Sequence, residues 1–431
     1  MLLEQELAFY QAHLTNSLLP FWDRAYDPIC GGVFTCFNNW GDRLLSQDKY
    51  VWSQGRMAWV YARTARDIAS GMLPALTGKE KEYLEKAAAI CAFLRSCAIL
   101  PETEGGCAYL LVRDGTKKES IPGRGYYTSF FVDCFVILGF SEYALAAKDP
   151  DCLELALQLY DRVRGMIGRG KIVTEPYPIA DGFESQAVDM ILSCTSNNLW
   201  NALKAAGHSR AEEINRNSLA YVERILTVFY RPDLGVLQEL RPVRTDLADT
   251  FSARHIMPGH ALESMWFCIK ILEENNQPLD DRIFIIANNS LKLGWDEQLG
   301  GMLRCVDCQG GQPCGRRLPN DPYEQLMAET WSSKLWWVHS ETLYTTMLCW
   351  LITQDPFYRS CYERTRSYVM KRFLHPDPRI GEWVQILDRE GRPEDKLVAL
   401  PVKDPFHIVR NVLMMIELLT AKIEGSPTWQ V

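Results

Sequence analysis

The sequence predicts an all-α protein, an (α/α)6 barrel of six helical hairpins with short β-hairpin loops at one end, forming one domain over residues 1–431. Two observations predict this fold. Apolar residues recur at helical spacing almost throughout, and Gly-rich breaks with strand-like flanks interrupt the helices at intervals of roughly 65 to 80 residues. Such an interval suits a pair of helices with their connection. The breaks lie at residues 27–34, 104–109, 168–173, 233–237, 296–303 and 379–383.

Each hairpin is expected to contribute a first and a second helix. The first helices are predicted over residues 3–24, 79–97, 150–167, 209–230, 279–293 and 357–373. The second helices are predicted over residues 50–69, 126–147, 183–206, 259–274, 331–352 and 406–422. If the second helices form an inner ring, they run parallel and their N-termini gather beside the Gly-rich loops. We therefore expect the chemistry at that end of the barrel.

The composition excludes several classes of protein. A net charge of −8 with interspersed signs argues against a nucleic-acid or anionic-membrane partner. Glu4 and Glu6 stand where a signal peptide carries basic residues, and no apolar run approaches the length that spans a bilayer. The 14 cysteines are scattered through apolar helical runs, as reduced thiols are in the cytoplasm. The 13 tryptophans favour an aromatic cleft for a sugar-sized ligand in a cytoplasmic enzyme.

One cysteine cluster resembles part of a zinc site. Cys305 and Cys308 are followed by Cys314, but no fourth cysteine or histidine lies within the usual spacing. We therefore interpret the segment as a Gly-rich loop that carries thiols and expect no metal there.

The most informative motif places His260 and Glu263 three residues apart after Pro258-Gly259, a helix start. In the first helical turn the peptide dipoles favour an ionised Glu263 and disfavour a protonated His260. The imidazole would then stay neutral and could act as a base. A capping histidine, or half of a metal site, would give the same pattern.

Further charged or titratable residues stand near the starts of other second helices, namely Arg56, Glu341 and His407. Helix N-termini in general prefer Ser, Thr, Asp and Asn, so histidines and an arginine there indicate a site. Arg56 could bind an anion or an oxyanion, or pair with a structural carboxylate. Trp337 and Glu341 share a helix face and could bind a sugar, or belong to the core.

Two histidines, an arginine and carboxylates, without a phosphate loop or dinucleotide motif, favour proton transfer at carbon. Arg56 would stabilise an enolate while an imidazole removes the proton beside a carbonyl. If His260 and His407 flank opposite faces of one carbon, the result is inversion, whereas a single base acting at C2 and C1 gives aldose–ketose isomerisation. A glycoside hydrolase acting through a carboxylate pair and a non-catalytic sugar-binding protein are the alternatives.

The motifs also resemble those of the N-acylglucosamine 2-epimerase family, which includes cellobiose 2-epimerases and mannose isomerases. Over nearly the whole chain, in family order, lie Gly31-Gly-Val-Phe-Thr-Cys36, Lys49-Tyr-Val-Trp-Ser-Gln-Gly-Arg56, Arg254-His-Ile-Met-Pro-Gly-His-Ala-Leu-Glu263, Lys334-Leu-Trp-Trp-Val-His-Ser-Glu341 and Gly381-Glu-Trp383. The resemblance implies a six-hairpin barrel. It further implies the catalytic residues His260, His407, Arg56 and Glu263, and the substrate contacts Trp52, Trp337, Glu341, Trp383 and Arg410.

Within the family, the Lys49 and His260 motifs are most similar to the N-acetylglucosamine 2-epimerase branch. This similarity implies interconversion of N-acetyl-D-glucosamine and N-acetyl-D-mannosamine with no required cofactor, ATP as an allosteric activator, and a homodimer. Two segments depart from the branch. Residues 400–405 lead directly into Phe406-His407 without a Gly-rich run, and residues 310–327 look inserted. The departures leave the sugar and the ATP dependence open.

Overall fold

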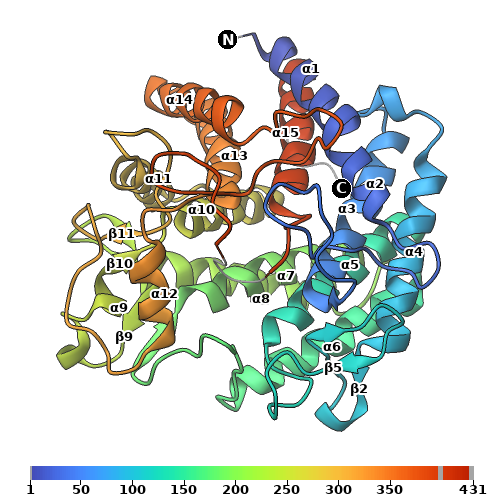
Figure 1. Ribbon diagram of the computed structural model, residues 1–431, viewed down its shortest axis with the longest axis horizontal. Helices are drawn as coiled ribbons and strands as arrows, with labels where there is room; N and C mark the ends of the chain where they lie inside the picture. The colour runs from blue at the N-terminus through green and yellow to red at the C-terminus, as the bar shows by residue number, and fades with distance from the viewer. Residues whose placement is uncertain (1, 397–400, 427–431) are drawn as a thin grey trace.

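The computed structural model describes residues 2–396 and 401–426, and the fold is predominantly helical (Figure 1). In the first hairpin, α1 continues through a π-helical turn, Leu14–Leu18, into α2. The first helices of the hairpins are α1 (Leu3–His13) with α2 (Leu19–Ala25), α4 (Glu80–Cys97), α6 (Pro150–Gly168), α8 (Ala211–Val228), α11 (Asp281–Gly294) and α14 (Pro356–Arg372).

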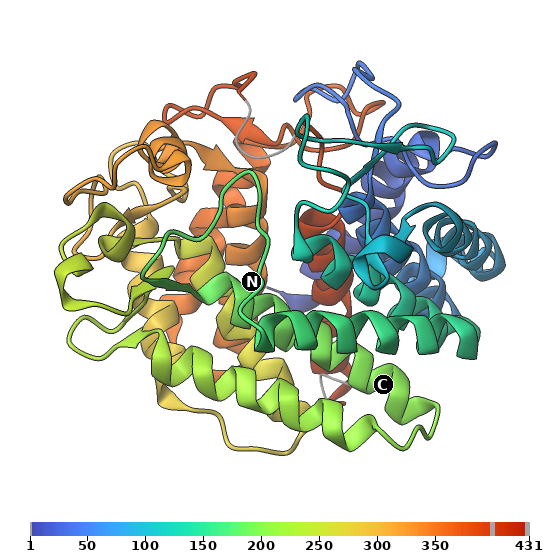
Figure 2. The same ribbon diagram turned by 90° about the horizontal axis from the view of Figure 1, so that it is seen from below.

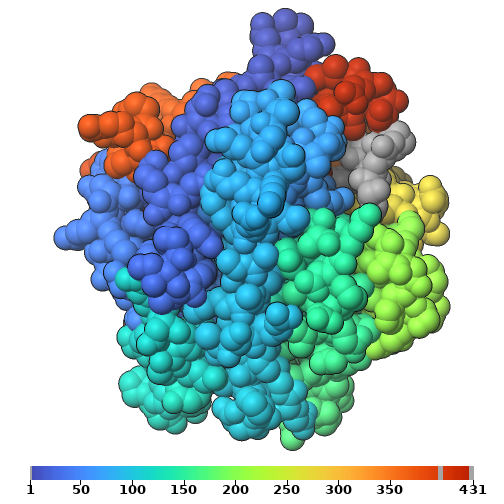
Figure 3. Space-filling view, turned by 90° about the vertical axis from the view of Figure 1, so that its right-hand side faces the viewer, coloured from blue at the N-terminus to red at the C-terminus, as the bar shows by residue number. Residues whose placement is uncertain are grey.

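The second helices are α3 (Val51–Ala69), α5 (Phe130–Ala147), α7 (Gln186–Ala205), α10 (Pro258–Glu274), α13 (Trp336–Thr353) and α15 (His407–Glu424). Each of them contacts the next, and α15 contacts α3, so the six form a closed inner ring. In Figure 1 the colour passes round the molecule from blue through green and yellow to red, and α15 lies beside α1. Figure 3 shows red beside blue at the top. The predicted helices are confirmed, with ends shifted by a few residues.

The short strands only partly follow the prediction. Two Gly-rich breaks form hairpins as expected, β2 (Ile99–Leu100) with β3 (Gly106–Cys107) and β7 (Tyr230–Arg231) with β8 (Val236–Leu237). Residues 169–173 and 379–383, all within the described part of the chain, form turns without a strand, so these two breaks are loops and not hairpins.

The remaining strands tie the start of an inner helix to a later loop. Because the residues just before these helices are extended, they offer backbone groups that a following loop can pair with. The pairs are β1 (Lys49–Tyr50) with β4 (Leu110–Leu111), β6 (Phe183–Ser185) with β9 (Leu240–Pro242), β10 (His255–Ile256) with β11 (Val306–Asp307), and β12 (Lys334–Leu335) with β13 (Ile386–Leu387). On its other edge β4 pairs with β5 (Lys117–Lys118). Figure 2 shows loops from both ends of the chain, in blue and red, along one upper edge.

A buried lysine anchors the start of α3. The Nζ atom of Lys49 donates to Asp27 Oδ2 at 3.0 Å and to the carbonyl oxygen of Gly31 at 2.6 Å. Gly32, which follows, has a φ of +82°, and a Cβ there would lie 2.6 Å from Gln54 Oε1, so the turn requires glycine. The ion pair thus fixes the first Gly-rich loop against the inner ring.

The same arrangement recurs four hairpins later, before α13. Lys334 Nζ donates to Asp296 Oδ2 at 3.2 Å and to the carbonyl oxygen of Gly300. Both lysines are completely buried, and Arg389 pairs with Asp296 as Arg113 pairs with Asp27. The repeat positions α3 and α13, two of the helices that carry candidate site residues.

The inner helix α5 corrects one sequence prediction. It is 18 residues long with a mean hydropathy of 1.7, so by length and composition it could cross a membrane, contrary to the expectation that no apolar run approaches that length. Within the ring, 72% of this helix is buried. A helix enclosed by other helices is apolar on all sides for that reason.

Candidate active site

A cavity of about 340 Å³ lies at the N-terminal end of the inner ring and is lined from the first turns of all six inner helices. The predicted convergence of these helix starts is therefore confirmed. The predicted site residues that line it are Trp52, Arg56, His260, Glu263, Trp337, His407 and Arg410. Among the described residues, Glu341 and Trp383 lie outside its lining.

His260 is held by a carboxylate that the sequence analysis missed. Its Nδ1 lies 3.0 Å from Glu239 Oε1 and 3.1 Å from Oε2. Burial lowers the pKa of His260, but the charge and hydrogen bond of Glu239 outweigh burial, so the net effect raises the pKa. The net direction is opposite to the one expected from the helix dipole, because the carboxylate of Glu239 is in direct hydrogen-bond contact with the imidazole. Because Glu239 engages Nδ1, the Nε2 atom of His260 is left for a substrate.

His407 begins α15, as predicted, and is also oriented by a carboxylate. Its Nδ1 lies 2.8 Å from Glu341 Oε1. Glu341 is completely buried and accepts from Trp266 Nε1 at 2.7 Å. The Glu341 side chain therefore lies behind His407, outside the cavity lining, and fixes the imidazole as a supporting carboxylate would.

Arg410 lies between two carboxylates. Its Nη2 donates to Glu263 Oε1 at 2.7 Å and to Glu341 Oε1 at 2.5 Å. Burial lowers the pKa of Arg410, but the two carboxylates outweigh it and raise the pKa. Glu263 therefore pairs with Arg410, which lies on another inner helix. Glu263, Glu341 and His407 could hold a metal ion by spacing alone, but a guanidinium already lies between the two carboxylates, so the donor set does not fit a cation.

Arg56 faces the cavity from the second turn of α3. Its Nη1 donates to Asp404 Oδ1 at 3.1 Å, and its Cζ lies 4.0 Å from the ring centre of Phe135 and 4.5 Å from that of Trp52. Burial lowers the pKa of Arg56 to about 10, with Asp404 opposing the shift. Among the described residues its buried Nε has no hydrogen-bond partner. The pairing with Asp404 uses one N–H of a guanidinium that lines the cavity, so the carboxylate contact does not preclude a hydrogen bond from Arg56 to a ligand oxygen.

Asp404 connects Arg56 to His407. Its Oδ2 accepts from Trp336 Nε1 at 3.0 Å and from the backbone N–H of His407 at 3.2 Å. Burial raises the pKa of Asp404, but the Arg56 charge outweighs it and lowers the pKa. The carboxylate therefore stays ionised and caps α15. The preceding residues 397–400, including the predicted departure at Leu400, lie outside the described residues.

Trp337 packs against both histidines. Its ring centre lies 4.8 Å from that of His260 and 5.9 Å from that of His407. Trp52 lines the cavity beside Phe135, with ring centres 4.9 Å apart. Aromatic faces of this kind are suited to stacking on a sugar ring, and one small ligand can reach both imidazoles.

The predicted substrate contact Trp383 is wrong. Its side chain is 2% exposed and its Nε1 donates to His13 Nε2 at 2.9 Å. The neighbouring Glu382 accepts from Trp22 Nε1 at 2.7 Å. These bonds direct the segment toward the first hairpin, away from the cavity.

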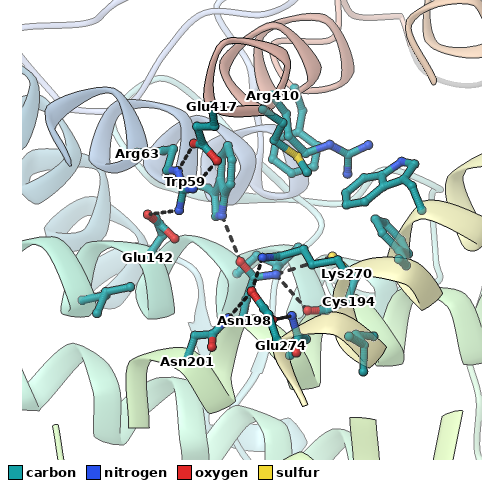
Figure 4. A pocket seen from close by; sticks show the side chains of 18 of the residues that line it. Trp59, Arg63, Glu142, Cys194, Asn198, Asn201, Lys270, Glu274, Arg410 and Glu417 are labelled. Atoms are coloured by element: carbon teal, nitrogen blue, oxygen red, sulfur yellow. Dashed lines mark hydrogen bonds and ion pairs between the residues drawn. The ribbon is translucent and has the colours of Figure 1, made fainter. Parts of the chain in front are cut away.

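A smaller chamber of about 60 Å³ lies deeper in the ring, at later turns of the inner helices (Figure 4). Phe406 and Arg410 are among five residues that line both spaces. Its charged side chains are paired, for example Arg63 Nη2 with Glu417 Oε2 at 2.6 Å and Arg63 Nη1 with Glu142 Oε1 at 3.6 Å. The pairs neutralise the charge at this end of the ring, in contrast to the histidine-rich end.

The cysteine loop is built around a carboxylate. Cys314 Sγ donates to Asp307 Oδ2 at 3.3 Å, Cys308 Sγ lies 3.8 Å from Oδ1, and Arg254 pairs with the same group at 2.7 Å. Asp307 is thereby satisfied by the loop itself. Cys305 is buried and its thiol points at the carbonyl of Met327.

Comparison with known proteins assigns the family. A family model described as N-acylglucosamine 2-epimerase (GlcNAc 2-epimerase) matches residues 32–410. The chain belongs to the N-acylglucosamine 2-epimerase family. Within this family it is 28% identical to the N-acylglucosamine 2-epimerase of Bos taurus over 415 residues, covering 94% of this chain and 89% of the relative. It is 21% identical to the cellobiose 2-epimerase of Dictyoglomus turgidum, covering 94% and 96%.

Solved structures share the fold. A cellobiose 2-epimerase from Bacillus thermoamylovorans superposes with a TM-score of 0.74 at 16% identity, covering 96% of this chain and 99% of the other. Membership of this family makes the protein a carbohydrate epimerase, which is an isomerase.

Proposed function

We propose that the protein is a sugar 2-epimerase that interconverts N-acetyl-D-glucosamine and N-acetyl-D-mannosamine. The observation that carries the proposal is that two carboxylate-held histidines and Arg56 line one cavity. The family assignment and the Bos taurus relative support the choice of sugar.

The reaction would proceed on the open-chain aldehyde. One histidine removes the proton from C2, the electron pair moves into the carbonyl, and the enolate oxygen accepts a hydrogen bond from Arg56. The other histidine then gives a proton to C2 from the opposite face, and the carbonyl re-forms with inverted configuration. Glu239 and Glu341 hold the two Nδ1 atoms, which leaves the Nε2 atoms to act at C2, with the Nε2 of His407 also 3.8 Å from Asp404 Oδ2.

The architecture that brings these groups together is proposed to be a single-domain (α/α)6 barrel, supported by the cyclic contacts of the inner helices. No cofactor is needed for a proton transfer of this kind. Activation by ATP, assembly as a homodimer and a cytoplasmic location remain predictions from the sequence.

The test is proton NMR in D2O with N-acetylmannosamine, N-acetylglucosamine, mannose and cellobiose, with and without ATP. Formation of the 2-epimer of an N-acetylated sugar supports the proposal. Formation of a ketose would favour the aldose–ketose isomerase alternative, and epimerisation of cellobiose or mannose alone would favour those sugars. No reaction with any of them, in a folded sample, would refute a role in sugar isomerisation.

A further inference from the structure

A buried lysine lies directly before the carboxylate that connects Arg56 to His407. Lys403 is 1% exposed, and its Nζ donates to the carbonyl oxygens of Asn39 at 2.6 Å and Trp383 at 2.7 Å. Asn39 follows α2 in the first hairpin, and Trp383 follows α14 near the other end of the chain. One ammonium therefore joins two loops that are distant in the sequence.

Side chains from the same two loops fix the residue that follows Lys403. Gln385 Oε1 accepts from the backbone N–H of Asp404 at 2.9 Å, and Gln385 Nε2 donates to the carbonyl oxygen of Asp404 at 3.2 Å. Asn39 Oδ1 in turn accepts from the backbone N–H of Gln385 at 2.8 Å. Asn39 and Gln385 are neutral, whereas an ammonium is a stronger donor than the amine left when it loses a proton. Lys403 is therefore the member of this set whose bonds depend on pH.

Asp404 transmits its position to two catalytic groups. Its Oδ1 accepts from Arg56 Nη1 at 3.1 Å, and its Oδ2 accepts from Trp336 Nε1 at 3.0 Å and from the backbone N–H of His407 at 3.2 Å. A shift of the Asp404 backbone would move the guanidinium that binds the enolate oxygen and the first turn of α15. A misplacement of about 1 Å in a reacting group can lower a rate about 10²-fold.

The surroundings of Lys403 bring its titration close to neutral pH. Burial lowers the pKa of Lys403 to about 8, and the charges of Glu382 and Asp42 oppose the shift. Burial raises the pKa of Glu382 to about 7, with Lys403 opposing. Glu382 is held in place by Trp22 Nε1, which donates to its Oε2 at 2.7 Å. Lys403 therefore changes charge within the pH range of an ordinary enzyme assay.

We propose that Lys403 is a positioning residue for catalysis: its ammonium holds Asp404 where it aims Arg56 and caps the helix of His407, and turnover falls when Lys403 loses its proton. The inference rests on the proposed function, because that function gives Arg56 and His407 their roles. Lys403 is not among the described residues that line the cavity, so it acts through Asp404 and not on the sugar.

The experiment uses two readouts, one of which needs no turnover. The indole N–H signal of Trp336 in ¹⁵N NMR, assigned by its loss in Trp336→Phe, reports on the bond to Asp404. The second readout is kcat and KM for N-acetylmannosamine, measured from about pH 6 to about pH 10. In the wild type we expect the signal to shift and kcat to fall together, with a midpoint at about pH 8. KM should change less than about threefold, because the oxyanion contact is made in the transition state.

Two variants change the charge at this position in different ways. Lys403→Met cannot carry a charge, so its kcat should be about 10²-fold lower at neutral pH, and neither readout should change near pH 8. Glu382→Gln keeps Lys403 but removes a carboxylate that favours the ammonium, so the midpoint should move to lower pH. Lys49→Met is the matched control. It removes another completely buried lysine, which pairs with Asp27, and should keep the wild-type midpoint.

The outcomes separate this role from a purely structural one and from the proposed function. A lower kcat in Lys403→Met with the wild-type midpoint assigns the pH dependence to another group, such as His260, and overturns the proposal. A wild-type midpoint in Glu382→Gln also overturns it, and this variant decides if Lys403→Met does not fold. A Trp336 signal whose midpoint moves in Glu382→Gln, without turnover of any sugar, supports the hold of Lys403 on Asp404 and overturns the epimerase proposal.

Discussion

The carboxylate of Glu239 sets the protonation of His260, and Glu239→Gln tests this directly. An opposite charge in hydrogen-bond contact, here at 3.0 Å, favours the protonated imidazole and raises the pKa of His260. Removal of the charge should therefore lower the pKa of His260. The neutral imidazole then persists to lower pH. The glutamine amide can also donate to Nδ1, which leaves the proton on Nε2 and removes the base, so kcat should fall about 10²- to 10⁴-fold.

The assay is a histidine-selective ¹³C NMR titration, with the His260 signal assigned by its loss in His260→Asn, alongside turnover measured by proton NMR. Glu184→Gln is the control, because Glu184 is 43% exposed on β6 and pairs with Arg241. Glu184→Gln should change neither the pKa of His260 nor the turnover. An unchanged His260 pKa in Glu239→Gln, or turnover within about threefold of the wild type, would refute the assigned role of Glu239.

Three further predictions concern groups around the cavity. Asp404→Asn should lower kcat about 10²- to 10³-fold, because Arg56 loses the partner that aims it; turnover is measured at a temperature where the variant is folded. Burial raises the pKa of Asp296, but Arg389 and Lys334 outweigh it and lower the pKa to about 2. The stabilisation from the Asp296 carboxylate is present above about pH 4 and is lost as the pH falls toward 2. The urea-unfolding deficit of Asp296→Asn should therefore shrink by about 1.8 kcal/mol between these two pH values. Trp383→Phe should leave KM unchanged and lower Tm, measured by calorimetry, because Trp383 bonds to His13 outside the cavity.

Local sequence signals were sufficient to predict the helices and the end of the ring at which the site lies. Pro258 before an apolar run marks the start of α10, and the regular Gly-rich breaks mark the hairpins. Because the second helices run the same way, His260 and His407 could be placed at one end without knowledge of their contacts. Helix starts, breaks and helix direction all depend on residues that are close together in the sequence.

The partners of the site residues could not be predicted in the same way. Glu239 reaches His260 from a loop 21 residues away, and Asp404 meets Arg56 across 348 residues. Such pairings depend on tertiary packing, and a lone carboxylate in a loop has no spacing that reveals it. Trp383 was misassigned for the converse reason, since its position in a Gly-rich motif says nothing of the bond to His13 that turns it away.

The central claim is that two histidines act on opposite faces of C2. It is tested most directly by following N-acetylmannosamine in D2O during the initial phase of conversion, with deuterium at C2 quantified separately in substrate and product. The account predicts deuterium at C2 of the product 2-epimer while the remaining substrate keeps its C2 proton, and no conversion in His260→Asn or His407→Asn. Product that retains the C2 proton, or deuterium entering both epimers equally from the start, would contradict it.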